Sequence, residues 1–331
     1  MKRWILYAVA AGAAAGIGMF LTGCGGLQRP SGEAQNGVKK IAVVQLMQHG
    51  SLDAANQGFL AGLAQNGFPA DKIQVDQQNA QGDQSNLKSI AARFKGDKPD
   101  LICAIATPAA QAAANDIHDV PIVGIAITDY VQAKLVQSNE KPGGNVTGAS
   151  DMNPVNRQID MALKLMPGAK KVGLLYNSSE VNSEVQGREM KKYAAEKGLT
   201  VVEKTVSSVN DIQQAAESMT GQIDFLYVPT DNILASSMPT LLKMTDAARI
   251  PVIAGAESMV KDGALASLSV DYYQLGVQAG AMAAKILKGE VQASALPVET
   301  QQNLIVVINK KNADLLGISI PEEIAGKARF E

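Results

Sequence analysis

Hydrophobic positions along most of the chain gather in short runs that lack polar alternation. Residues 41–46 and 172–176 form two such runs, and each precedes a polar loop and a helix-length amphipathic segment that stops at glycine. Unalternated apolar runs separated by helical segments are typical of parallel strands that are buried on both faces. The pattern therefore predicts an α/β protein with doubly wound parallel sheets.

The pattern occurs twice. The strand that starts near Lys39 has a counterpart near Lys170, and Val120-Pro121 has a counterpart in Ile250-Pro251, both about 130 positions later. An internal repeat of this kind indicates two similar structural units. We therefore expect two α/β lobes, each with its functional loops at the carboxyl ends of its strands.

Two extended segments are candidates for crossings between the lobes, at residues 145–151 and 267–271. A helix is expected at residues 274–287, a strand at 304–308 and a short helix at 310–316. A chain that crosses two or three times makes a hinge, with a cleft between the facing strand ends. The expected boundaries are residues 38–148 plus about 273–301 for one lobe, and 149–272 plus about 302–331 for the other.

The N-terminus resembles a processing signal. Lys2 and Arg3 precede an uncharged apolar stretch at residues 4–21, which fits a secretory signal, with an uncleaved membrane anchor as the alternative. The stretch ends in Leu21-Thr22-Gly23-Cys24, which resembles a bacterial lipobox in which Cys24 is lipidated. This predicts a signal peptide at 1–23, a lipidated Cys24 with a flexible tether at 24–37, and an extracytoplasmic protein held at the membrane by lipid.

Composition excludes several classes of function. Thirty Lys and Arg residues against 32 Asp and Glu residues give a net charge of −2, so no basic surface for nucleic acid is expected. Two cysteines and two histidines leave little for a disulfide framework, a metal site or histidine chemistry. We expect no metal and no cofactor, and a structural role for Cys103 within its apolar run.

Short polar motifs follow the predicted strands in a fixed order. They are Gln48-His49-Gly50-Ser51-Leu52-Asp53, residues 106–111, 146–151, 175–183 and 228–232, and Asp271-Tyr272-Tyr273-Gln274-Leu275-Gly276. With the lipobox, they resemble the ABC transporter substrate-binding lipoproteins of the tryptophan/tyrosine type, which have the type I periplasmic-binding fold. Gly50 departs from the proline expected there, which makes the first loop more flexible.

The resemblance implies a monomeric solute-binding protein whose partners are a small ligand, a permease and an ATPase. Thr107 and Pro108 are expected to start a helix, with Thr107 as its N-cap. The helix start at Thr107, Pro108, Ala109 and Ala110 would then bind a ligand carboxylate through its free N–H groups, and the alternative is capping alone.

Asp231 is a candidate partner for a ligand ammonium, and its alternative role is to cap the following helix. Glu180 and Asp271 are rival partners for the same ammonium. His49 is expected either to contact the ligand or to lie on the surface. The other candidate ligand-binding residues lie in the same loops: Ser51, Ser150, Asp151, Asn177, Asn182, Ser183, Thr230, Asn232, Gly255, Ala256 and Glu257.

The candidate loops hold acids and amides but almost no Arg or Lys, which disfavours phosphorylated ligands. The only tryptophan, Trp4, lies in the signal, so the mature chain lacks the residue that sugar-binding sites commonly stack on. A zwitterionic amino acid suits this inventory, and the family resemblance favours an aromatic one. The alternatives are a sensor module, or a binding protein for a sugar or a nucleoside. An enzyme is disfavoured because the mature chain lacks the common phosphate-loop, zinc-protease and nucleophile-elbow motifs.

Overall fold

The computed structural model describes residues 37–331. The predicted signal peptide, Cys24 and nearly all of the tether lie outside the described residues. Within residues 37–331, none of the helices combines the length and the apolar character that a membrane span requires.

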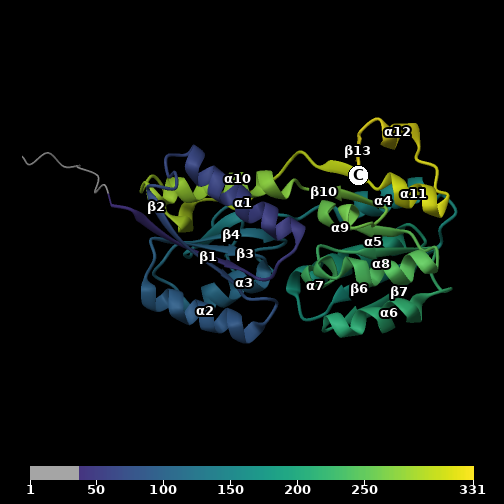
Figure 1. Cartoon of the computed structure of the whole chain (residues 1–331), viewed down its shortest axis with the longest axis horizontal. Coiled ribbons are helices and arrows are strands. Elements are labelled where there is room, and N and C mark those ends of the chain that lie inside the picture. The colour runs from purple at the N-terminus through teal and green to yellow at the C-terminus, as the bar shows by residue number, and fades with distance from the viewer. Residues whose placement is uncertain (1–36) are drawn as a thin grey trace, which may run out of the picture. The chain divides into compact units, whose positions relative to one another are not determined.

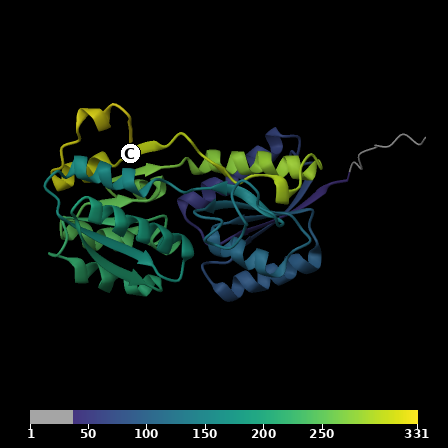
Figure 2. The same ribbon diagram turned by 180° about the vertical axis from the view of Figure 1, so that it is seen from behind.

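The first sheet has six strands, all parallel, in the order β11-β5-β4-β3-β1-β2. Helices α1 and α10 cover one face and α2 and α3 cover the other (Figures 1 and 2). We call this assembly lobe 1. Its strands are β1 (Lys39–Gln45), β2 (Ile73–Asn79), β3 (Leu101–Ile105), β4 (Ile122–Ile127), β5 (Val146–Ser150) and β11 (Glu299–Thr300), and its helices are α1 (Gly50–Gln65), α2 (Gln84–Asp97), α3 (Thr107–Asp116) and α10 (Tyr272–Leu287).

The second sheet has seven strands in the order β13-β12-β10-β9-β8-β6-β7. Helix α4 packs on α5, and α6 packs on α8. We call this assembly lobe 2. Its strands are β6 (Lys171–Asn177), β7 (Thr200–Val206), β8 (Phe225–Val228), β9 (Val252–Ala254), β10 (Ala266–Ser269), β12 (Ile305–Ile308) and β13 (Ala328–Phe330), and its helices are α4 (Val155–Leu165), α5 (Val181–Glu196), α6 (Ile212–Met219), α7 (Asn232–Ser236), α8 (Met238–Ala247), α9 (Glu257–Lys261), α11 (Lys310–Leu316) and α12 (Glu322–Ala325).

The repeat predicted from the sequence is confirmed as a repeated sheet topology. The order β2-β1-β3-β4-β5 in lobe 1 matches β7-β6-β8-β9-β10 in lobe 2. Strand β12 departs from the parallel pattern, because it pairs antiparallel to β10. The chain re-enters lobe 2 from β11 at the edge where the parallel strands end, so β12 runs back across the sheet.

The chain passes between the sheets three times, after β5, after β10 and after β11. The segment at 145–151, expected as a crossing, is mostly strand β5, which pairs with β4 and β11, and the crossing follows at 151–154. Helix α10 starts at Tyr272, two residues earlier than expected, because the Asp271 carboxylate caps it by accepting a 3.0 Å hydrogen bond from the Gln274 N–H. The predicted helix at 310–316 agrees with α11.

Helices α1 and α10 pack backbone against backbone through glycines. A Cβ on Gly58 would lie 2.0 Å from the Tyr273 carbonyl oxygen, and a Cβ on Gly276 would lie 2.1 Å from that of Ala55. Any larger residue at either glycine would push the helices apart. This contact fixes the start of α1, after His49, relative to the start of α10 at Tyr272.

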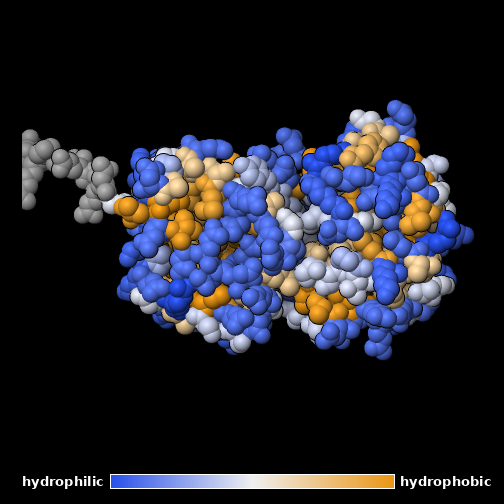
Figure 3. All heavy atoms as spheres, in the orientation of Figure 1, coloured by the Kyte–Doolittle hydropathy of each residue, from blue (hydrophilic) through white to orange (hydrophobic). Residues whose placement is uncertain are grey.

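The cores lie between the sheets and their helices, and every residue of β3, β4 and β5 is buried. Covered on both faces, these strands need no polar alternation, which accounts for the hydrophobic pattern of the sequence. On the face drawn in Figure 3, hydrophobic residues lie in separate groups among hydrophilic ones.

Candidate functional site at the junction of the two sheets

A small cavity lies where the carboxyl ends of both sets of strands meet. Its volume is about 10 Å³, which is roughly the space that one water molecule needs. A ligand the size of an amino acid therefore requires the surrounding residues to move apart. The lining residues are His49, Ser51, Leu52, Ala126, Asp151, Asn182, Thr230, Asp231, Asn232, Ala235, Ala256, Met259 and Tyr272.

Many residues singled out in the sequence are brought together here. The predicted residues that line the cavity are His49, Ser51, Asp151, Asn182, Thr230, Asp231, Asn232 and Ala256. Asn177, Glu180 and Ser183 stand directly behind them, each hydrogen-bonded to one of the lining residues. Ser150 lies behind Asp151, where its hydroxyl donates a 2.8 Å hydrogen bond to the Thr128 carbonyl.

Asp231 has the capping role that was its alternative. Its carboxylate accepts hydrogen bonds from the Leu234 N–H at 2.9 Å, the Asn177 N–H at 2.6 Å and the Ser183 hydroxyl at 2.7 Å. Burial raises its pKa. Asp231 therefore ties β6, α5 and α7 together.

Glu180 is also fully enclosed. Its carboxylate accepts hydrogen bonds from the side-chain amides of Asn177 at 3.2 Å, Asn182 at 3.0 Å and Asn232 at 2.6 Å. Burial, together with the nearby charge of Asp231, raises its pKa to about 7.

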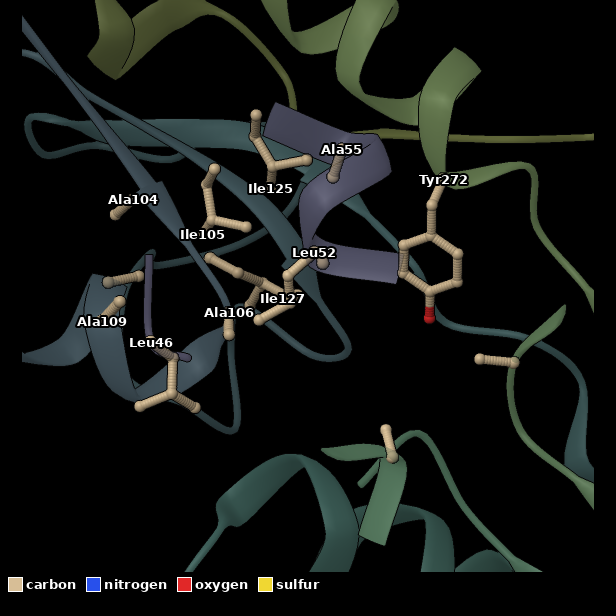
Figure 4. Packing of buried hydrophobic residues seen from close by; sticks show 14 of the residues in the cluster. Leu46, Leu52, Ala55, Ala104, Ile105, Ala106, Ala109, Ile125, Ile127 and Tyr272 are labelled. Carbon is tan, nitrogen blue, oxygen red and sulfur yellow. The ribbon is translucent and has the colours of Figure 1, made fainter. Parts of the chain in front are cut away.

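Asp151 follows β5 at the first crossing. Its carboxylate accepts hydrogen bonds from two hydroxyls, that of Tyr272 at 2.8 Å and that of Thr128 at 3.1 Å. In Figure 4 the Tyr272 side chain extends from the start of α10 with its hydroxyl pointing away from the helix. Burial raises the pKa of Asp151.

His49 precedes α1 and reaches across to lobe 2. Its Nε2 lies 3.2 Å from Asn232 Oδ1, while its Nδ1 is buried and has no partner among the described residues. Burial lowers its pKa, which favours the neutral ring. Nearby, the Ser51 hydroxyl lies 2.8 Å from that of Ser258, which also joins the two lobes.

The charge of this region is one-sided. Asp151, Glu180 and Asp231 are buried, whereas no Lys or Arg side chain of residues 37–331 is buried. Buried carboxylates without a cation are costly, so a cationic group of a ligand would stabilise them. Within the described part of the chain, no group of three His, Cys, Asp or Glu side chains gathers as a metal site would require.

The start of α3 differs from the prediction. The N-cap is Ala106, with a φ of 83°, and Thr107 is already the first helical residue and makes no capping hydrogen bond. The cause is that β3 turns directly into the helix through one residue in the left-handed region. The hydroxyl of Thr107 is buried without a partner in the described structure, and neither it nor Pro108, Ala109 or Ala110 lines the small cavity.

Three other predicted residues lie outside the small cavity. Glu257 and Asp271 line a separate cavity of about 200 Å³, where Glu257 forms ion pairs with Lys261 and Arg329. The carbonyl of Gly255 accepts a 2.6 Å hydrogen bond from the Asn153 amide.

Five lining residues are not predicted from the sequence: Leu52, Ala126, Ala235, Met259 and Tyr272. Tyr272 lies in the polar motif that starts at Asp271, and that motif could have indicated it. Ala126 has a φ of 57°, a conformation that a sequence does not reveal for alanine. The network also contains Gln186, whose amide donates to the Thr230 hydroxyl from the middle of α5.

Comparison with known proteins agrees with this architecture. The profile of the ABC transporter substrate binding protein family matches residues 40–330. A tyrosine-binding protein of Clostridioides difficile is 44% identical over 304 residues, which cover 89% of this chain and 87% of that protein.

Solved structures of similar sequence have the same fold. An ABC domain from Streptococcus pneumoniae in complex with L-Trp has 41% identity and a TM-score of 0.86, with 88% of this chain and 99% of that chain covered. The ligand-free, open structure of CD0873, a substrate-binding protein with adhesive properties from Clostridium difficile, has 43% identity and a TM-score of 0.69, with 89% and 99% covered.

Proposed function

Because the chain belongs to the ABC transporter substrate-binding proteins, a family of solute-binding proteins rather than enzymes, we propose that it captures an aromatic amino acid outside the cytoplasm for an ABC importer. The observation that carries the proposal is the group of buried carboxyls Asp151, Glu180 and Asp231 in a part of the chain, residues 37–331, that buries no Lys or Arg side chain. A zwitterion supplies the missing cation through its ammonium group.

Asp151 is the carboxylate that we assign to the ligand ammonium. It lines the cavity and accepts hydrogen bonds from only two hydroxyls, so it keeps lone pairs for a further donor. Asp231 already accepts from two backbone N–H groups and one hydroxyl, and Glu180 accepts from three amides. Both therefore act mainly by holding the site together and by adding negative charge.

The start of α3 is the proposed site for the ligand carboxylate. A helix N-terminus offers N–H groups and a partial positive charge to an anion. The Thr107 hydroxyl is buried beside them and has no partner among residues 37–331, so it is a further donor for the same anion. The N–H groups of Thr107 and Ala109 are those that the helix itself does not use.

An aromatic side chain is proposed from the relatives, one named for tyrosine and one bound to L-Trp. Leu52, Ala126, Ala235, Met259 and the Tyr272 ring provide apolar lining that suits such a side chain. Tyr, Trp and Phe are the candidate ligands, and a sugar, a nucleoside or a sensor role remain the alternatives to be tested.

Capture is proposed to occur by closure of the lobes on the ligand. Two relatives of nearly equal identity support this, because the chain has a higher TM-score against the L-Trp complex (0.86) than against the ligand-free, open structure (0.69). A closed arrangement of the lobes would account for this difference. The contacts that would hold the closed form are His49 with Asn232 and Ser51 with Ser258.

The remaining proposals concern the cellular setting. Lipidation of Cys24 would anchor a monomer at the membrane, with permease and ATPase subunits as partners. Mass spectrometry of the protein from a membrane fraction tests the anchor, since Cys24→Ala should abolish the lipid adduct and release the protein.

The test of the ligand is thermal unfolding of a chain starting at residue 25, against single amino acids, sugars and nucleosides. Such a chain retains residues 38–331, which form one compact unit. A ligand at 100 times its Kd adds about 2.7 kcal/mol of stability. Stabilisation by Tyr, Trp or Phe is expected, and stabilisation by a sugar or nucleoside alone would contradict the ligand assignment.

A further inference from the structure

A series of hydrogen-bonded side-chain amides explains why Nδ1 of His49 has no partner among the described residues. The series starts at two backbone groups, the Ser179 N–H and the Thr230 carbonyl. The Asn177 side-chain oxygen accepts a 3.0 Å hydrogen bond from the Ser179 N–H, so its amide nitrogen faces Glu180. The Asn182 amide nitrogen donates to the Thr230 carbonyl at 3.1 Å and also to Glu180. Both oxygens of Glu180 are therefore acceptors.

This arrangement of Glu180 determines the orientation of the next amide. Asn232 lies 2.6 Å from the same carboxylate oxygen that Asn182 contacts, so it presents its amide nitrogen there. Its oxygen Oδ1 consequently faces His49, 3.2 Å from Nε2. An oxygen accepts a hydrogen bond, so Nε2 must carry the proton. The neutral ring then has a bare Nδ1, buried and without a partner in the described structure.

The side-chain oxygen of Asn182 is likewise an acceptor without a partner in the described structure. The nitrogen of Asn182 is used by Glu180 and Thr230, and the oxygen Oδ1 is buried with no partner among residues 37–331. His49 and Asn182 both line the small cavity. The site therefore presents two neutral acceptors, one from each lobe.

We propose that Glu180, acting through Asn232, holds His49 in the Nε2–H tautomer so that Nδ1 accepts a hydrogen bond from the ammonium of the bound amino acid, with Asn182 Oδ1 as a second neutral acceptor. This inference rests on the proposed function and deepens it. Glu180 and Asn232 are positioning residues, whereas His49 and Asn182 contact the ligand.

The charges around His49 favour an ammonium over other ligand groups. Asp151, Asp231 and Glu180 surround the cavity or stand directly behind it, so a ligand carboxylate at Nδ1 would be repelled. A protonated His49 would itself supply the cation and compete with the ligand. Burial opposes this, because it lowers the pKa of His49, although the hydrogen bond with Asn232 and the nearby Asp53 act in the other direction.

The first experiment reads the tautomer directly. The chain has two histidines, so His118→Gln leaves His49 as the only one, and its ring ¹⁵N signals can be recorded with L-Tyr bound. The expected spectrum shows a protonated Nε2 and an unprotonated Nδ1. A protonated Nδ1 with a bare Nε2, or an imidazolium, would overturn the inference.

Two variants separate positioning from closure. Asn232→Leu removes the acceptor at Nε2 and should give mixed tautomers together with a loss of L-Tyr affinity of at least about tenfold. Ser258→Ala removes a different bond between the lobes and should weaken binding without changing the tautomer. Tautomer signals that do not change in Asn232→Leu would contradict the role of Asn232.

The last experiment identifies the ligand atom. L-Tyr, L-Phe and 3-(4-hydroxyphenyl)propionate, which lacks the ammonium, are titrated against the wild type and His49→Phe. The preference for L-Tyr over the deaminated acid should fall at least about tenfold in the variant. An unchanged preference, or a change only in the Tyr-to-Phe ratio, would overturn the ammonium assignment. Binding of no amino acid would overturn the proposed function as well.

Discussion

The Tyr272 hydroxyl donates a 2.8 Å hydrogen bond to Asp151 Oδ2 and so joins the first residue of α10 to the residue that follows β5. Each residue lies beside a different crossing between the lobes. The position of the Asp151 carboxylate is therefore fixed by the hinge itself. Ligand binding and hinge geometry share this pair.

Tyr272→Phe should lower L-Tyr affinity by about tenfold near neutral pH, because a buried carboxylate loses one of its two hydroxyl donors. The pKa of Asp151, already raised by burial, should rise further, so part of the affinity should return at higher pH. Calorimetric titrations at about pH 6 and about pH 8 measure both effects. Tyr273→Phe is the matched control, since Tyr273 is exposed and should show no change.

The main effect of Asp231→Asn should be a lower stability of the fold. The carboxylate caps α7 and accepts from the Asn177 N–H and the Ser183 hydroxyl, so its loss should cost about 1–3 kcal/mol of the free energy of unfolding. Urea unfolding of the ligand-free chain measures this. Wild-type stability in the variant would refute the structural role that we assign to Asp231.

The contribution of Glu180 to the stability of the ligand-free chain should fall as pH rises from about 4.5 to about 7. Burial and Asp231 raise the pKa of Glu180 from 4.5 to about 7, so the folded state binds more protons than the unfolded state across this range. The raised pKa values of Asp231 and Asp151 act in the same direction, whereas the lowered pKa of His49 acts in the opposite one. Thermal unfolding of the wild type and of Glu180→Gln across this range tests the sign, because the stability difference between them should change as pH rises.

The affinity for L-Tyr should depend on pH in the opposite direction. An ammonium favours the ionised carboxyls, so L-Tyr should bind more tightly as pH rises toward about 7, with release of protons. Calorimetry in two buffers of different ionisation enthalpy counts these protons. Proton uptake on binding would contradict the role of the buried carboxyls.

Gly276→Ala should destabilise the fold by several kcal/mol, because its Cβ would lie 2.1 Å from the Ala55 carbonyl oxygen in the contact between α1 and α10. Gly96→Ala is the matched control. Gly96 lies in α2 with no atom within 4 Å of an added Cβ, so alanine there should be neutral or slightly stabilising. Denaturant midpoints of the two variants should differ clearly.

The fold could be predicted because its signals are local and repeated. Apolar runs such as residues 101–105 are long enough to indicate buried strands, and the recurrence of Lys39 at Lys170 indicated the second lobe. The direction of β12 could not be predicted in this way. It depends on where the chain re-enters lobe 2, and a pattern of apolar residues does not contain that information.

The site was predictable where polar residues follow strands, as Asp151 and Asp231 do. It was not predictable where a side chain acts from inside a helix, as Gln186 does, since an amide there resembles a surface residue in sequence. Thr107 shows a third limit. Whether it caps α3 depends on the backbone of Ala106, whose positive φ gives no sign in the sequence.

We propose that this chain binds an aromatic amino acid through the ligand ammonium group at Asp151. The most direct test is calorimetric titration of L-Tyr, L-Trp and L-Phe into the wild type and Asp151→Asn. We predict one site per chain for at least one of the three, and a loss of affinity of at least about tenfold in the variant. No binding to the wild type, or equal affinity in the variant, would contradict the claim.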